Sequence, residues 1–251
     1  MKMITEMRPS IVRSVLAAAL LSAAAPMPVQ ALQQEFSTKE TRALMHAYSK
    51  CVVERQAKKA SEALLENADN GTILRKYRQL ISGECLARQT KQTSQMKFGG
   101  DLYRYALADA LVARELAGAP VLDFSAVPRL DHRDPGEAPS ETTKSGKRLG
   151  KAKYDEALRN YRQSASFSYL SRYGECVVRV APSGAKALLL TAPDSSEENA
   201  RFRELGTALA TCLPPGETLR FGRVVLRGTI AINYYRLSHA ARRMGARAAQ
   251  S

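Results

Sequence analysis

Apolar residues recur at helical spacing along most of the chain. Between residues 39 and 52 they fall three or four positions apart, at Leu44, Tyr48, Cys51 and Val52. This is the period of one face of an α-helix, and Ser37 with Glu40 forms the capping-box pattern that starts one. The same period predicts helices over 58–65, 72–87, 101–116, 195–212 and 219–243. The pattern therefore predicts an all-α fold.

One of these predictions conflicts with local propensity. The stretch 224–235 is rich in Val, Ile, Thr and Tyr, which are residues that favour strands. Its counterpart in the first half of the chain, 102–113, has a clear helical pattern. We predict a helix at 224–235 because of that correspondence.

The first 31 residues have the layout of a cleavable secretory signal. Basic residues precede an apolar stretch at 15–25, two prolines follow it, and small residues occupy positions −3 and −1 at Val29 and Ala31. The apolar stretch is too short to cross a bilayer, so an uncleaved anchor is the less favoured alternative. We expect cleavage after Ala31, no transmembrane span in the mature chain, and export to the periplasm or the medium of a bacterium.

The two halves of the chain repeat each other. Residues 48–69 and 173–194 share 8 identities in 22 aligned positions at an offset of 125. The matches include Tyr-x-x-Cys-Val-Val, Ala and Leu-Leu. Further on, a Cys-Leu pair recurs at offset 127, and Phe-Gly and Arg recur at offset 123. Repetition in a constant order predicts two related modules of about four helices each, at 32–117 and 153–251.

This arrangement resembles a family of exported bacterial proteins of no known function, in which similar Cys-paired helical modules recur. The likeness covers 48–117 and 173–240 and includes the Leu-Arg-Gly motif at 226–228. The first module has Tyr103-Arg104-Tyr105 at that place, so the motif is degenerate there. The resemblance implies export and a helical module, and it brings no catalytic residue with it.

Residues 118–152 separate the predicted modules. Four prolines interrupt any helix between 120 and 139, and 142–153 is small, polar and basic, as flexible linkers often are. An ordered loop packed on one module is the alternative, and Val121, Leu122, Phe124 and Val127 would anchor it. With a flexible linker we expect the modules to behave as nearly separate units.

The four cysteines predict disulfides. Two cysteines occur at matching places in each half, and exported proteins commonly form such bonds. Three pairings are possible. The duplication selects Cys51–Cys85 and Cys176–Cys212, because each module must once have folded alone. A redox or metal role is less favoured, since no C-x-x-C motif is present and the chain has 3 histidines. We predict no metal and no cofactor.

Residues for catalysis are scarce. His46 lies five positions before Cys51 and so faces away from it on a helix, and His132 and His239 have no acid or serine beside them in a recognisable motif. No phosphate-binding loop, zinc-protease motif or nucleophile elbow occurs in the sequence. We therefore predict no catalytic residue.

Arginines are the candidate binding groups. Arg104 and Arg227 occupy equivalent places in the two modules, either as buried packing residues or as anion-binding groups. After Glu217 the chain has seven arginines and no acidic residue. Four of them, Arg236, Arg242, Arg243 and Arg247, lie along one predicted helix end, where they either face an anion or are simply solvated.

The formal net charge of +14 and the predicted export suggest a function. We expect a non-catalytic binding protein of the cell envelope, whose partner is a protein or an anionic component such as a lipid headgroup or a polymer. Nucleic acid is an improbable partner for an exported chain without interleaved aromatic residues. The alternatives are an enzyme that holds an anionic substrate between the modules, for example at Arg227, and a periplasmic stress chaperone.

Overall fold

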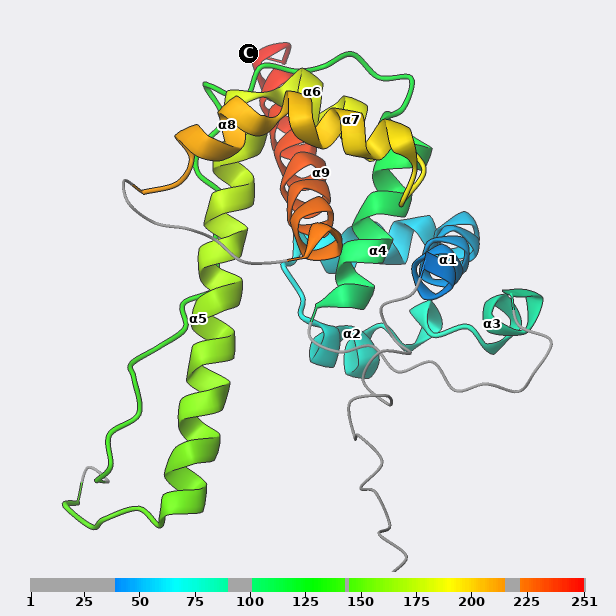
Figure 1. Ribbon diagram of the computed structural model, residues 1–251. Helices are drawn as coiled ribbons and strands as arrows, with labels where there is room; N and C mark the ends of the chain where they lie inside the picture. The colour runs from blue at the N-terminus through cyan, green and yellow to red at the C-terminus, as the bar shows by residue number, and fades with distance from the viewer. Residues whose placement is uncertain (1–38, 90–100, 143–144, 215–221, 251) are drawn as a thin grey trace, which may run out of the picture. The chain divides into compact units, whose positions relative to one another are not determined.

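The computed structural model describes residues 39–89, 101–142, 145–214 and 222–250. These residues form an all-helical fold (Figure 1). The first half contains α1 (Lys39–Leu65), α2 (Asn70–Lys76), a short 3₁₀ helix η2 (Arg78–Leu80), α3 (Gly83–Gln89), α4 (Leu102–Leu111) and a π-helical turn η3 (Val112–Leu116). The second contains α5 (Lys151–Val180), α6 (Pro182–Leu189), α7 (Ser196–Glu204), α8 (Gly206–Thr211) and α9 (Arg223–Ala248).

Some predicted features fall on other parts of the chain. The predicted signal, residues 1–31, lies outside the described residues, as do Ser37 of the capping box and the Phe-Gly motifs near 98 and 221. Within the described ranges, no helix combines the length and the apolar character that a membrane crossing requires.

The helices of the first half follow the predicted order, with one correction. α1 changes direction at Gln56, whose φ of −133° and ψ of 35° are not helical, so it contains both helices predicted before residue 65. The prediction of one continuous helix over 72–87 is wrong. That segment divides into α2, η2 and α3, and the carboxylate of Asp69 caps α2 by accepting the Thr72 amide at 2.5 Å.

The second half has breaks at related places. α5 and α6 meet at Ala181, where φ is −138° and ψ is 64°, 125 positions after Gln56. The segment predicted as one helix over 195–212 divides at Leu205 into α7 and α8. α5 is longer than its counterpart, with 30 residues in one helix. The two halves therefore share their breaks and their cysteine positions and differ in helix length, so the internal symmetry is partial.

The helix predicted against local propensity is present. α9 continues through 224–235, and every residue from Arg227 to Ser238 is buried. Burial on all sides explains why β-branched residues occur in this helix: tertiary packing outweighs the small differences in propensity.

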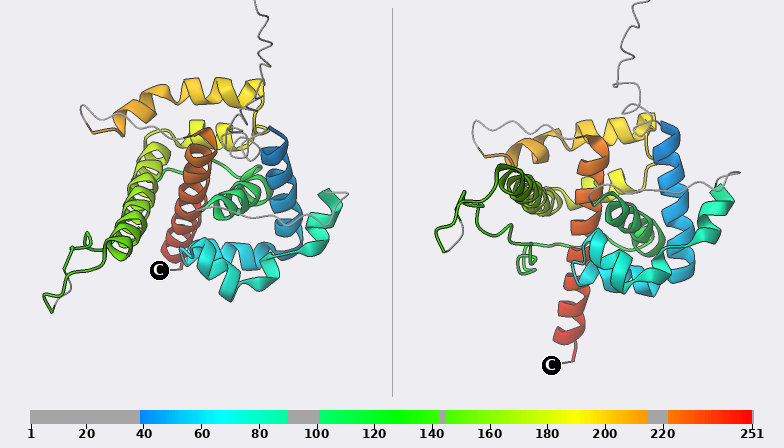
Figure 2. Two further views of the ribbon diagram at one scale, coloured as in Figure 1. Left: turned by 60° about the horizontal axis from the view of Figure 1, so that its bottom comes forward. Right: turned by 90° about the horizontal axis from the view of Figure 1, so that it is seen from below.

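Helices from the two halves share one hydrophobic core. α4 packs against both α1 and α9, and α9 also packs against α5 (Figures 1 and 2). At the crossing of α4 and α9, Gly228 contacts Tyr105 so closely that a Cβ at position 228 would lie 2.2 Å from the Tyr105 Cβ. The buried residues of both halves belong to one cluster. This packing disagrees with our expectation of nearly separate modules.

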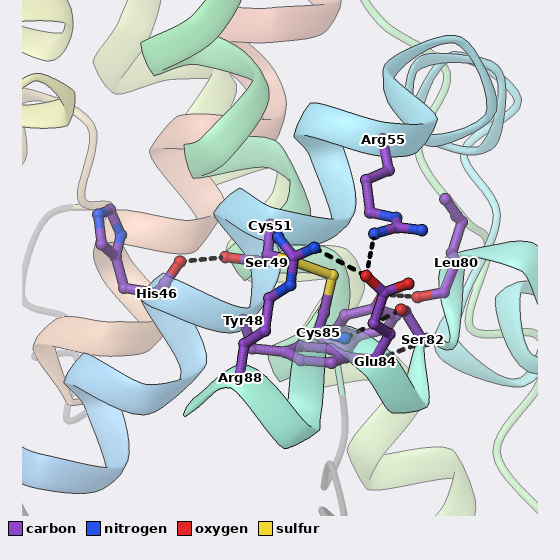
Figure 3. The surroundings of a disulfide bond; sticks show 11 residues. His46, Tyr48, Ser49, Cys51, Arg55, Leu80, Ser82, Glu84, Cys85 and Arg88 are labelled. Atoms are coloured by element: carbon purple, nitrogen blue, oxygen red, sulfur yellow. Dashed lines mark hydrogen bonds and ion pairs between the residues drawn. A yellow bond between two sulfur atoms is a disulfide. The ribbon is translucent and has the colours of Figure 1, made fainter. Parts of the chain in front are cut away.

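The disulfides are those predicted from the duplication. Cys51 of α1 is bonded to Cys85 of α3, and Cys176 of α5 to Cys212 at the end of α8, so none of the four cysteines is free. Around the first bond, the Ser82 amide donates to the Tyr48 hydroxyl at 3.0 Å, and Glu84 lies between Arg55 and Arg88 (Figure 3). The two halves thus each carry one internal cross-link.

The segment between α4 and α5 packs against the helices over part of its length. Phe124 and Val127 are buried, and the Phe124 ring meets the Tyr234 ring of α9 edge to face. Arg179 of α5 donates to the carbonyls of Phe124, Val127 and Pro128. We call residues 123–136 the strap. The alternative of an ordered loop therefore fits the strap at Phe124 and Val127, while Val121 is exposed.

Candidate anion-binding site

Arg227 lies at the centre of a buried ionic cluster. Its side chain comes from α9, in the half of the chain that carries no acid after Glu217, and it is 7% exposed. The carboxylates that neutralise it come from α4 and α7: Nε and Nη2 donate to Asp109 at 2.9 and 3.2 Å, and Nη1 donates to Glu198 at 2.9 Å. The remaining acceptors are the Thr191 hydroxyl and the carbonyls of Leu188, Leu189 and Thr191.

These contacts use all the donors of Arg227. A guanidinium has five N–H groups, and each nitrogen of Arg227 faces at least one protein acceptor. An anionic ligand would have to displace a carboxylate. The cavity beside this cluster measures about 60 Å³, well below the roughly 300–1,000 Å³ typical of small-molecule sites. The geometry therefore favours the packing interpretation of Arg227.

Arg104 has a different environment from its counterpart. Its Nη1 lies 3.5 Å from Asp101, its Nη2 donates to the Asn67 side chain, and its Nε has no acceptor in the described part of the chain. Burial lowers the pKa of Arg104 to about 10, Asp101 opposes that shift, and the nearby Arg133 and Arg236 add to it. Arg104 therefore stays cationic at neutral pH but faces buried protein groups.

His132 of the strap bridges two residues of α5. Its Nε2 lies 2.5 Å from Glu175 Oε2, and its Nδ1 lies 2.8 Å from Ser171 Oγ. Glu175 also accepts the Leu130 amide at 3.1 Å and Arg179 Nε at 2.8 Å. Burial raises the pKa of Glu175, but the bonds from His132, Arg179 and Leu130 outweigh it and lower the pKa to about 2.

This arrangement fastens the strap to α5. A serine, a histidine and an acid in contact are also the groups of a nucleophilic site. Ser171, however, lies in the middle of α5, where the neighbouring backbone amides are used by the helix. It thus lacks the adjacent amide donors that stabilise an oxyanion. Glu175 also accepts from the cationic Arg179 and from the Leu130 amide. The cluster is therefore a structural clamp that holds the strap against α5.

A groove lies between the strap and the last turns of α9. Its volume is about 470 Å³. The strap contributes Val127, Pro128, Arg129, Leu130 and Asp131, and α9 contributes Arg236, Ala240, Arg243, Met244 and Arg247. We call this the arginine groove. Four of its ten residues are arginines and one is an acid, so its lining carries a formal charge of +3.

Arg236 is the buried arginine of the groove. Its side chain is 6% exposed, its Nη2 donates to the Asp131 carbonyl at 3.0 Å, and its Nη1 has no acceptor among the residues described. Burial lowers its pKa, Asp131 and Glu175 oppose that shift, and Arg133 adds to it. A buried cation with an unused donor gains from an anionic partner.

The other three arginines are exposed at the rim of the groove. Arg129, Arg243 and Arg247 are exposed, and none is in an ion pair within the described residues. α9 positions two of them, because residues 236, 240, 243 and 247 lie on one helical face. Arg242 is exposed on the same helix but does not line the groove.

The structure thus brings together only part of the predicted set. Arg243 and Arg247 line the groove with Arg236, whereas Arg104 and Arg227 lie in separate buried clusters. Sequence reasoning missed Arg129, because it belongs to a proline-rich segment more than 100 residues before Arg236. No periodic pattern links the strap to that helix, so the sequence contains no signal for their contact.

Metal-binding side chains do not gather in the described ranges: no group of three or more His, Cys, Asp or Glu residues is placed to hold an ion. Comparisons with known proteins found no match among family models, curated proteins or solved structures.

Proposed function

We propose that this chain is an exported binding protein of the bacterial cell envelope, periplasmic or secreted, that binds an anionic envelope component in the arginine groove without catalysis. The observation that carries the proposal is the convergence of four arginines on one groove of about 470 Å³ with a single acid in its lining. Two disulfides support export, because such bonds persist in oxidising compartments.

The charge balance around the groove supports an anionic partner over a neutral one. The three rim arginines have no carboxylate partner in the described chain, and the groove that they share contains a single acid. Uncompensated positive charge at a concave site raises the local concentration of anions. A partner with several negative charges, such as an envelope polymer or a lipid headgroup, would gain the most binding free energy.

The alternatives have less support from the geometry. An enzyme with an anionic substrate at Arg227 would need donors that Asp109 and Glu198 already use. A chaperone needs a continuous apolar surface, but the large exposed apolar residues come from separate segments. These are Leu74, Ile81, Val121, Val180, Leu190 and Met244.

Binding to anionic probes tests the proposal. We would measure sedimentation with phosphatidylcholine vesicles with and without phosphatidylglycerol, and titration with polyphosphate as a soluble polymer. We expect the protein to bind the anionic probes and to lose affinity as salt rises past physiological strength, where the Debye length is about 8 Å. Replacement of Arg129, Arg243 and Arg247 by Gln should weaken binding by about 3 kcal/mol, at about 1 kcal/mol per arginine.

The matched control removes the same charge elsewhere. Arg78, Arg159 and Arg162 are exposed, lie outside the groove and have no ion pair in the part of the chain described. Their joint replacement by Gln should change the affinity by less than half as much. If the wild-type protein binds neither anionic probe, or if the two triple variants lose the same amount of affinity, the proposal is wrong.

A further inference from the structure

The lining of the arginine groove has two chemical parts. Beside the four arginines it contains Val127, Pro128 and Leu130 of the strap and Ala240 and Met244 of α9. Ala240 and Met244 are one turn apart on the helical face that also carries Arg236, Arg243 and Arg247. Apolar and cationic side chains therefore alternate along the same wall, and a bound molecule would meet both.

We propose that the arginine groove binds the head region of an anionic lipid, with a phosphate among the rim arginines and the adjoining carbons against Leu130, Ala240 and Met244. This inference rests on the proposed function and specifies its ligand. The rim arginines would contact the phosphate oxygens, since a guanidinium matches phosphate geometry in two-point contacts. Arg236 would add its positive charge from beneath the lining, where its Nη1 has no acceptor among the described residues and almost no surface accessible to water.

The apolar part of the lining distinguishes a lipid from a polymer or a free anion. Inorganic phosphate or polyphosphate would engage the arginines alone and leave the apolar side chains in water. Met244 is 39% exposed and is the large apolar residue on this part of α9. A molecule that removes it from water gains hydrophobic free energy in proportion to the area covered. The groove, at about 470 Å³, also falls in the size range of sites for small organic molecules.

The two walls of the groove are held in place before any ligand binds. Arg179 fixes the carbonyls of Val127 and Pro128 at 3.0 and 2.8 Å, Glu175 accepts the Leu130 amide, and Arg236 holds the Asp131 carbonyl. Fixed walls lower the ordering cost of binding. The strap therefore acts as a built wall of the site, with its clamp on α5 and its apolar side facing α9.

The first test uses soluble short-chain lipids. We would titrate the full mature protein with dihexanoyl phosphatidic acid, glycerol phosphate, inorganic phosphate and dihexanoyl phosphatidylcholine by calorimetry. The anionic lipid should bind about tenfold or more tightly than glycerol phosphate, which corresponds to the burial of a few methylene groups. Equal affinities for lipid and glycerol phosphate would overturn the inference while leaving an anion site in place.

Two substitutions then separate the apolar part from the charges. Met244→Gln should weaken lipid binding by about tenfold and leave polyphosphate binding unchanged, while Leu74→Gln, at a 51% exposed leucine on α2, should change neither. Asp131→Asn should tighten the binding of both ligands, because it removes the single acid of the lining. Its gain of affinity cannot arise from misfolding.

The outcomes distinguish the inference from the function on which it rests. If Met244→Gln weakens lipid and polyphosphate binding equally, or neither, the groove does not recognise a lipid. If lipid and polyphosphate both fail to bind the wild-type protein, the proposed function is wrong as well.

Discussion

Arg227 of α9 holds both carboxylate oxygens of Asp109 of α4, at 2.9 and 3.2 Å, across 118 positions of sequence. Both side chains are less than 10% exposed. Glu198 of α7 occupies the other side of the same guanidinium. The pair joins the two halves of the chain at a point where both charges are largely shielded from water.

Removal of Asp109 should destabilise the whole protein. Breaking a buried ion pair leaves an uncompensated charge, at a cost of about 3–5 kcal/mol, and Glu198 remains to neutralise part of it here. We expect Asp109→Ala to lower the free energy of unfolding in urea by about 3 kcal/mol in a single transition that includes both halves. Glu197→Ala removes an exposed pair with Arg201 and should cost less than 1 kcal/mol. Separate unfolding transitions for the two halves would contradict this prediction, and so would equal losses of stability in the two variants.

Gly228 should not tolerate a side chain. Its equivalent in the first half, at offset 123, is Tyr105, and the two contact each other where α4 crosses α9. We expect Gly228→Ala to lower the free energy of unfolding by roughly 1–3 kcal/mol through overpacking. Gly245→Ala in the same helix has nothing within 4 Å of the new Cβ and should raise stability slightly, since alanine favours a helix over glycine. Thermal melting of the two variants compares them directly.

The sequence predicted what depends on local pattern and on the repeat. The helical class, the cysteine pairs and α9 followed from periodicity and from matching positions. The break inside 72–87 did not, because its causes are distant: the Ser82 amide is used by the Tyr48 hydroxyl, and the Leu80 carbonyl accepts from Tyr103. Ser82 and Gly83 mark the start of α3 locally, but tertiary bonds of this kind leave no signal in the sequence.

The groove could be predicted only in part for the same reason. The α9 arginines were visible as a run without acids, but the strap has no periodic pattern. Its position depends on Arg179 and Glu175 of α5, which bond to backbone groups that any sequence would offer. His132 has Asp131 and Asp134 close by in sequence, but it meets Glu175 only through the fold.

Loss of the second disulfide should affect both halves. Replacing Cys176 and Cys212 by Ser opens a loop of 36 residues, for which chain entropy predicts a loss of about 3–4 kcal/mol. Our expectation from the sequence was that the first module would be affected much less than the second. Because α9 packs on both α4 and α5, we now expect hydrogen exchange to increase in both halves. Increased exchange in the second half alone would restore the view of separate modules.

Glu175 should stabilise the protein in a pH-dependent way. Its pKa in the folded protein, about 2, lies below the ordinary value of 4.5. Its contribution is therefore complete above pH 4.5 and is lost as the pH falls through 2. This lowering of the pKa corresponds to about 3 kcal/mol of stability. In urea unfolding, Glu175→Gln should be less stable than wild type at pH 6 and nearly equal at pH 2.

The control for this pH dependence is an exposed acid. The Arg55 bond to Glu84 lowers the pKa of that carboxylate, but its side chain is 52% exposed, so solvent screens the interaction. Glu84→Gln should therefore change the stability little at either pH. A difference between wild type and Glu175→Gln that persists at pH 2 would show that the loss comes from packing and not from the charge.

Two adjacent arginines can decide whether the groove or diffuse charge binds anions. Arg242 and Arg243 are both exposed, carry the same charge and lie on the same helix, but Arg243 lines the groove and Arg242 does not. Arg243→Gln should weaken polyphosphate binding by about 1 kcal/mol, or about fivefold. Arg242→Gln should weaken it by much less, because Arg242 is not part of the groove lining. Both variants lose one charge, so any effect of net charge cancels in the comparison. Equal losses of affinity in the two variants would show that the end of α9 attracts anions through its diffuse positive charge. The arginine groove would then have no special part in binding.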